Sequence, residues 1–151
     1  MVGNARSLAK LGAFMANGGA FGGKTLISPE TWDTIHKDPK LGRMGGFSNT
    51  DFTQGGFNAH NYFHDSAANE MLHQADEQIA KGREGFYGWM GVGGSVFQWN
   101  PELKISFAYV TFDLMFLDDN DTKAKSLQVA VKNCVSGKIP VEVVGGKAFC
   151  C

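Results

Sequence analysis

The stretch from Tyr87 to Asn100 constrains the fold more than any other part of the chain. It reads Tyr-Gly-Trp-Met-Gly-Val-Gly-Gly-Ser-Val-Phe-Gln-Trp-Asn, dense in glycine at its start and β-prone at its end. Glycine inside a strand pattern marks a bulge or a place where a ligand or another backbone comes close. Asn100-Pro-Glu then turns the chain, and residues 104–111 run back. We therefore predict a β-hairpin whose first strand has an open, glycine-lined edge.

Length and charge limit the classes of function. A chain of 151 residues is one domain or part of one, and 43% hydrophobic with 19% charged residues favours a globular chain. The net charge of −1 gives no basic excess for nucleic acid and no polybasic tract for an anionic membrane. No apolar run is long enough to span a bilayer, and the first residues lack a secretory signal pattern. We expect no nucleic-acid partner and no membrane partner, and the abrupt start suggests that something upstream is missing.

Apolar periodicity and capping residues predict four helices. The expected ranges are 4–17, a short helix that starts at Ser28-Pro-Glu and ends at Asp38-Pro39, 66–81, and about 122–135. In the last helix the residues expected to face inward are Ala124, Leu127, Ala130 or Val131, and Cys134. We expect one domain over residues 3–135, an irregular loop over 40–64 that its aromatic residues pack in place, and an irregular tail over 136–151.

Cysteine and histidine spacings give no strong metal signal. Cys134 is expected to be a small buried residue, and Cys150 and Cys151 end the chain without any Cys-x-x-Cys spacing. His60 and His64 are four apart, but glycines break the segment and no glutamate follows as in zinc proteases. The acidic cluster Asp118, Asp119 and Asp121 lacks the glycine and distal glutamate of a calcium loop, so a helix cap is the simpler interpretation. We expect no metal and no cofactor.

Three segments occur in a specific order along the chain. They are Asn4-Ala-Arg-Ser-Leu-Ala-Lys-Leu with Ala16-Asn-Gly-Gly and Leu26-Ile-Ser-Pro-Glu-Thr31; Gly88-Trp-Met-Gly-Val-Gly-Gly-Ser95 with the strand, turn and strand that follow; and Asp121-Thr-Lys-Ala-Lys-Ser-Leu127. The ordered trio resembles the serine β-lactamase-like family, which includes class C β-lactamases, DD-peptidases and related esterases. The glycine pattern alone is a weak signal, and the order of the three segments is a stronger one.

The resemblance implies an α+β fold, with helices flanking an antiparallel sheet, of which this chain would be the carboxyl-terminal part. It places Trp89, Met90 and Gly91 where the family has its third motif, Lys-Thr-Gly, His-x-Gly or Trp-x-Gly. Val92 would then give a backbone N–H to the oxyanion hole, and Gly93 would leave room for substrate. Because Trp89 carries no cation, recognition of a substrate carboxylate is not implied, and an ester or amide substrate is.

The family nucleophile lies in a Ser-x-x-Lys motif far upstream, and that motif is not found here in the right order. Ser7-Leu-Ala-Lys10 has the spelling, and a serine one helical turn from a lysine base is the arrangement that nucleophilic catalysis needs. The same spacing also describes two polar residues on an ordinary amphipathic helix, and the resemblance places this helix after the nucleophile. We favour the second interpretation.

Two functions follow as expectations. The first is a fragment of a β-lactamase-related serine hydrolase that works through an acyl-enzyme, supplies the third-motif strand and is inactive alone. The alternative is a non-catalytic pseudo-enzyme remnant that binds a partner through the aromatic residues of 47–63. A sheet that lacks strands would expose an edge, so self-association through that edge is also expected. The sequence does not indicate the compartment.

Overall fold

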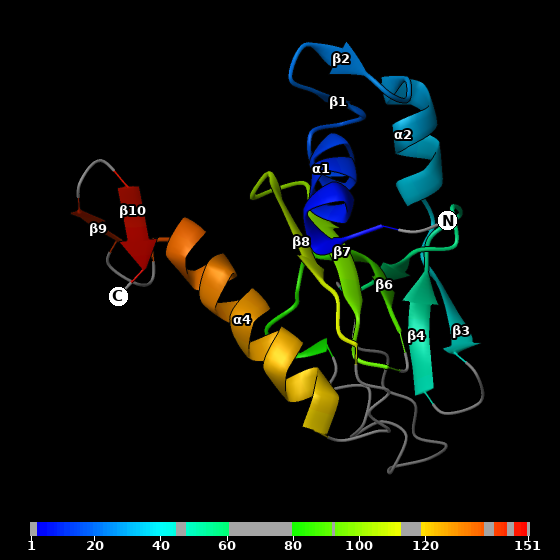
Figure 1. The fold of residues 1–151 in the computed structure, drawn as a ribbon. Coiled ribbons are helices and arrows are strands. Elements are labelled where there is room, and N and C mark those ends of the chain that lie inside the picture. Colours follow the sequence, from blue (N-terminus) through cyan, green and yellow to red (C-terminus); the bar gives the residue numbers. More distant parts are fainter. Residues whose placement is uncertain are drawn as a thin grey trace.

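The computed structural model describes residues 3–44, 48–60, 80–91, 93–112, 119–137, 141–144 and 147–150. These residues form helices packed on an antiparallel sheet, which confirms the expected α+β class (Figure 1). The helices are α1 (Ala5–Ala16), α2 (Pro29–His36) and α4 (Asp119–Val135). No helix among the described residues is both long and apolar enough to cross a membrane.

The main sheet is an antiparallel meander with the order β3-β4-β5-β6-β7-β8. Its strands are β3 (Lys40–Met44), β4 (Ser48–Phe52), β5 (Asn58–Ala59), β6 (Tyr87–Met90), β7 (Val96–Asn100) and β8 (Ile105–Tyr109). Each of these strands pairs with the next strand that the structure describes along the chain. Four of the five residues of β7 are buried, and its Trp99 is 1% exposed.

The sequence prediction for residues 40–64 was wrong where the structure describes them. The segment contributes β3, β4 and β5 to the main sheet instead of an irregular loop. Gly42 interrupts β3, β4 is mostly polar and β5 has two residues, so no apolar alternation revealed these strands. Packing explains the glycine at position 42. A Cβ there would lie 2.7 Å from the Phe52 ring on the neighbouring strand.

The stretch from Tyr87 to Asn100 is two strands, not the single first strand that we predicted. The chain reverses between β6 and β7, where the Gly94 N–H donates to the Gly91 carbonyl at 2.9 Å and Gly94 has φ +83°. The reversal at Asn100 is confirmed, since the Asn100 side-chain oxygen accepts from the Leu103 N–H at 2.9 Å. β6 is therefore an inner strand of the sheet along part of its length.

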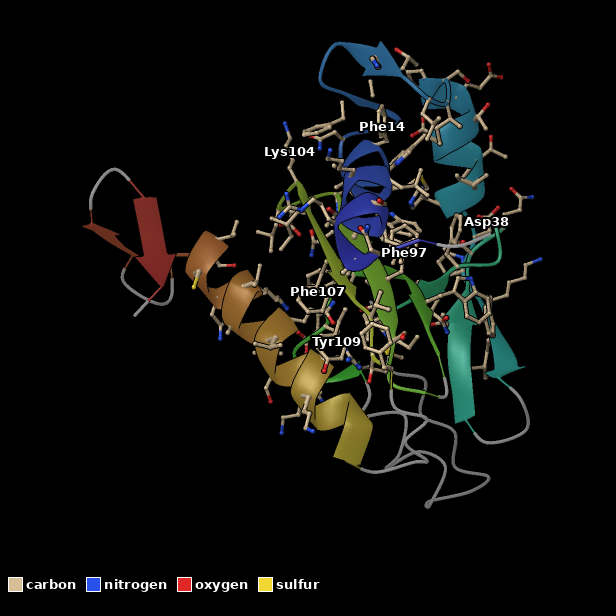
Figure 2. All side chains as sticks on the ribbon, in the orientation of Figure 1. Phe14, Asp38, Phe97, Lys104, Phe107 and Tyr109 are labelled. Carbon is tan, nitrogen blue, oxygen red and sulfur yellow. The ribbon has the colours of Figure 1, made fainter. Side chains whose placement is uncertain are left out.

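The first two helices start where their capping residues predicted. The Asn4 side chain accepts from the Ser7 N–H, and Ser28 caps α2 with a proline in the first turn. α1 packs on β7 and β8, beside Phe97 (Figure 2). A Cβ on Gly12 would lie 2.8 Å from Ser106 Cβ, and the Ser106 hydroxyl donates to the Ala9 carbonyl at 2.6 Å.

α4 presents a different face from the one predicted. Ala124 is fully buried as expected, but Leu127 and Val131 are 52% and 39% exposed, and Gln128 is fully buried instead. The helix also starts earlier, at Asp119. Its buried face is rotated because a buried amide partner holds Gln128, as described below. The predicted helix at 66–81 lies mostly outside the described residues, and Ala80 is helical.

The carboxyl-terminal tail contains paired strands where irregular chain was expected. β9 (Val141–Val144) and β10 (Lys147–Cys150) form an antiparallel hairpin that contacts α4. A second small hairpin, β1 (Ala20–Phe21) with β2 (Lys24–Thr25), joins α1 to α2. Cys134 is half-buried and disulfide-bonded, whereas we expected a small buried residue.

Candidate functional site

The carboxyl half of β6 is a partly open strand end. β5 pairs only with Tyr87 and Gly88, whereas β7 pairs with β6 as far as Met90. Beyond Gly88, β6 has no neighbour on the β5 side among the described residues. Within the described residues, the open edge that we predicted is therefore limited to Trp89 and Met90.

The hydrogen bonds around β6 show which backbone groups face this open side. The His60 N–H donates to the Phe86 carbonyl across the β5 side, and the Gly91 N–H donates to the Ser95 carbonyl across the β7 side, at 2.7 Å. Alternate residues of an antiparallel strand face the same neighbour. The backbone N–H and carbonyl of Met90 therefore face the open side, where a peptide-like or acyl group could lie along the strand.

Packing within the described residues explains the glycine at position 88 and does not explain the glycine at position 91. Gly88 has φ +133°, and a Cβ there would stand against the Phe97 carbonyl oxygen and 2.9 Å from Gln98 Cα. Gly91 is exposed, lacks a positive φ, and a Cβ would meet nothing closer than the Ser95 carbonyl oxygen at 3.6 Å. The fold thus requires glycine at position 88, whereas the described contacts give no steric reason for glycine at position 91.

Trp89 forms an aromatic surface beside this edge. It is 44% exposed, and its ring centroid lies 5.9 Å from that of Phe52. The indole N–H is a donor only, so this wall offers apolar area and no acid–base group. Met90 and Gly93 are half-buried, and Val92, the candidate oxyanion donor, lies outside the described residues.

Ser7 is an exposed residue of the α1 cap. Its N–H and its hydroxyl both donate to the Asn4 side-chain oxygen, at 3.0 and 3.2 Å. Lys10 is also exposed. These contacts account for Ser7 as a first-turn residue of an amphipathic helix, in agreement with the interpretation we favoured.

A buried chain of polar side chains lies behind β6, and sequence reasoning missed it. Arg83 Nε donates to Gln128 Oε1 at 2.9 Å, Gln128 Nε2 donates to Gln98 Oε1 at 2.7 Å, and Gln98 Nε2 contacts His60 Nε2 at 2.8 Å. All four side chains are at most 4% exposed. Because an amide nitrogen can only donate, His60 Nε2 is the acceptor and the ring proton is on Nδ1.

This arrangement keeps His60 neutral. Burial lowers the pKa of His60 to about 3, and the charge of Arg83 lowers it as well. A neutral histidine whose Nε2 accepts from Gln98 serves as an acceptor inside the fold, and the neighbouring amide occupies the nitrogen that a metal would take. Among the described residues no three His, Cys, Asp or Glu side chains gather to hold a metal, and His64 and Asp118 lie outside those residues.

His36 has the corresponding place on the opposite face of the sheet. Its Nδ1–H donates to the Trp32 carbonyl at 2.7 Å, and its Nε2 accepts from Trp99 Nε1 at 2.9 Å. Burial lowers its pKa, and the bond to Trp32 opposes that effect. His36 thus joins α2 to β7, and its helical position alone gave no signal of this role.

Comparison with known proteins gives support from structure and not from sequence. No protein-family model matches the chain, and no curated protein does. Among solved structures, a family VIII carboxylesterase is similar with a TM-score of 0.57 and 18% identity over 86% of this chain. That esterase has a β-lactamase-like fold, so the expected fold is confirmed at this level. The chain spans 31% of the length of that esterase.

Proposed function

We propose that this chain is part of a serine hydrolase domain of β-lactamase-like fold, in which the open end of β6 forms one wall of an acyl-transfer site. The main observation behind this proposal is the environment of Gly91. It is exposed at the end of the partly open strand, and no contact in the described part of the chain requires glycine there. Glycine at such a place lets a ligand approach the backbone closely.

The chemistry of this wall favours a neutral ester or amide. An oxyanion needs fixed donors about 3 Å away, and a backbone N–H on a rigid strand requires no reorganisation. Met90 faces the open side and would present its backbone N–H there, while Val92, the donor expected from the sequence, lies outside the described residues. Trp89 and Phe52 add aromatic surface but no cation, so an acyl or aryl group fits this wall better than a substrate carboxylate.

The nucleophile comes from outside this sequence under the proposal. Its serine oxygen attacks the substrate carbonyl, the alcohol or amine leaves with a proton, and an acyl-enzyme forms. Water then attacks the acyl carbon, releases the acid and returns the proton to the serine. Ser7 does not serve this step, because its hydroxyl donates to Asn4 in the helix cap.

A labelling experiment tests the proposal. The gene product extended upstream is treated with a fluorophosphonate probe, alone and with Gly91→Ala or Gly3→Ala. Gly3 is an exposed glycine with nothing within 4 Å of its Cβ position, so it is a matched control. We expect labelling of the extended protein, a labelling rate about tenfold lower for Gly91→Ala, and no change for Gly3→Ala.

The 151-residue chain alone should not label. Labelling of this chain that Ser7→Ala abolishes would contradict the proposal, and so would an extended protein in which Gly91→Ala labels at the normal rate. An extended product that lacks any Ser-x-x-Lys and never labels would favour the second candidate, a non-catalytic binding module. The exposed Trp89 beside Phe52 is the observation that favours such a module.

A further inference from the structure

The buried chain from Arg83 to His60 is directional. Each donor lies on the Arg83 side and each acceptor on the His60 side, so the amides of Gln128 and Gln98 have one consistent orientation. Reversing either amide would set donor against donor or acceptor against acceptor. Such buried networks specify one arrangement when every link is made and are costly when one link is lost.

The network crosses the motif strand at Gly88. In the sheet register Asn58, Gly88 and Gln98 stand side by side on β5, β6 and β7. His60 follows β5 by one residue, so the Gln98–His60 hydrogen bond joins the two strands on either side of β6. Neighbouring strands lie about 4.8 Å apart, so this bond passes over a strand that has no side chain at that point.

α4 reaches the same strand by a second route, through the turn that leads into β6. Lys132 donates to the Gly82 carbonyl at 3.3 Å and pairs with Glu84 at 2.7 Å. A Cβ on Gly82 would lie 2.6 Å from a methyl group of Val129. α4 therefore contacts the chain directly before β6 and, through Gln128 and Gln98, the strand directly after it.

We infer that Gln128 is a positioning residue of the proposed site, through which α4 fixes the placement of β6 and so the placement of Trp89 and Gly91. This inference rests on the proposed function for its catalytic meaning, and the structural coupling stands without it. The network touches no reacting atom. It holds the strand that forms the wall.

Two variants at position 128 distinguish the loss of both hydrogen bonds of Gln128 from the loss of its bond to Gln98 alone. Gln128→Met keeps the size of the side chain and removes both hydrogen bonds. Gln128→Glu keeps an acceptor for Arg83 and removes the donor to Gln98. Leu127→Met, on the exposed neighbour, is the control. The readout on the 151-residue chain is amide hydrogen exchange at Trp89 and Gly91, together with the ring nitrogen spectrum of His60.

For both variants we expect exchange at Trp89 and Gly91 about tenfold faster, because one buried hydrogen bond lost is worth roughly that factor in local opening. The His60 Nε2 resonance should shift, because Gln98 loses the partner of its Oε1 and its amide is held less firmly against His60. Leu127→Met should change neither readout. His60→Gln, whose amide oxygen can accept from Gln98, should restore slow exchange relative to His60→Leu.

Unchanged exchange at Trp89 and Gly91 in a folded Gln128→Met protein would overturn the inference, and so would equal changes in Leu127→Met. If Gln128→Met does not fold, Gln128→Glu decides by the same criterion. In an extended protein that carries a nucleophile, the same variants should lower kcat and leave KM unchanged. Absence of any activity there would count against the proposed function alone, because the exchange measurement needs no catalysis.

Discussion

The two faces of the six-stranded sheet are held in different ways. On the face that α1 and α2 cover, aromatic rings surround His36, with centroids 5.0 Å away for Tyr87 and 5.9 Å for Trp99. On the opposite face, here called the α4 face because α4 contributes Gln128 to it, amide side chains and Arg83 lead to His60. Each face buries one neutral histidine whose Nε2 accepts a hydrogen bond.

The difference lies in what a single lost contact leaves behind. Aromatic packing is spread over many weak contacts, so the α1 face can relax around a change of shape. In the α4 face every amide serves two partners, so a lost link leaves polar atoms buried without a partner. The α1 face should therefore tolerate substitution better, and the α4 face should fix one geometry more strictly.

The largest expected loss of stability is at Gly88, where the hydrogen bond between Gln98 and His60 passes over β6. Gly88→Ala should lower the free energy of unfolding by about 4 kcal/mol or more, since the methyl group meets the Phe97 carbonyl and φ is positive. Gly91→Ala should stay within about 0.5 kcal/mol. Urea denaturation measures both. Equal losses of unfolding free energy at the two positions would contradict the conclusion that the fold requires glycine only at position 88 of these two.

Gln98→Leu should rank next, at about 3 kcal/mol. It leaves the Gln128 amide nitrogen and His60 Nε2 buried without their partner, and each such atom costs about 1–3 kcal/mol. The double variant Gln98→Leu with Gln128→Leu should cost less than the sum of the two single variants, because it removes both sides of one contact. Additive losses in the cycle would argue that the network is not a unit.

On the opposite face, His36→Phe should cost about 2 kcal/mol. The ring still packs against its aromatic neighbours, and the main loss is the acceptor for the Trp99 indole N–H. Denaturation followed by tryptophan fluorescence gives the value. A loss above that of Gln98→Leu would reverse the ranking of the two faces.

Acid should weaken both faces through their histidines. Burial lowers both pKa values below 6.5, so the unfolded chain binds protons that the folded chain does not. Stability is then fully present above about pH 6.5 and falls with acid, by up to about 1.4 kcal/mol per pH unit for each histidine, for His60 down to about pH 3. Denaturation between pH 7.5 and 5 should show a shallower slope for His60→Gln than for the parent. An unchanged slope would mean that His60 titrates in the folded chain.

The smallest expected effect on stability lies at the β8 edge of the sheet that the described residues form. β8 ends the described sheet order, and Phe112 just beyond it is fully exposed. We propose that copies of this chain associate through this edge, since unpaired strands beside apolar surface pair readily. Phe112→Lys should lower the average mass in sedimentation and change the unfolding free energy by less than about 0.5 kcal/mol. A parent chain that sediments as a monodisperse monomer would contradict this proposal.

The sequence predicted elements that local chemistry specifies. Asn4 and Ser28 marked helix starts because caps are local hydrogen bonds, and Asn100 marked the turn for the same reason. The strands at 40–59 were not predicted because they carry little apolar alternation, so that their identity depends on pairing with a partner strand. Trp89 and Gly91 could be proposed as site residues from a motif. The extent of the open edge of β6 could not be predicted, because it depends on where β5 ends.

The buried network could not be predicted from the pattern of the sequence. Gln98 lies 38 residues from His60 and 30 from Gln128, and each glutamine occupies a position that polarity assigns to solvent. The predicted inward face of α4 failed for this reason, since Leu127 is the apolar neighbour of Gln128. Only tertiary contact shows that an amide, not a leucine, is the buried residue.

The meander order of the sheet has a consequence for how the chain reaches its fold. Most pairings in β3 to β8 join strands a few residues apart, so loop closure adds little entropy cost at those steps, whereas residues 60–86 separate β5 from β6. α1 is different, since Ser106 on β8 contacts Ala9 across 97 residues. The sheet should form early by sequential addition of strands, and docking of α1 should be the late, slow event in refolding.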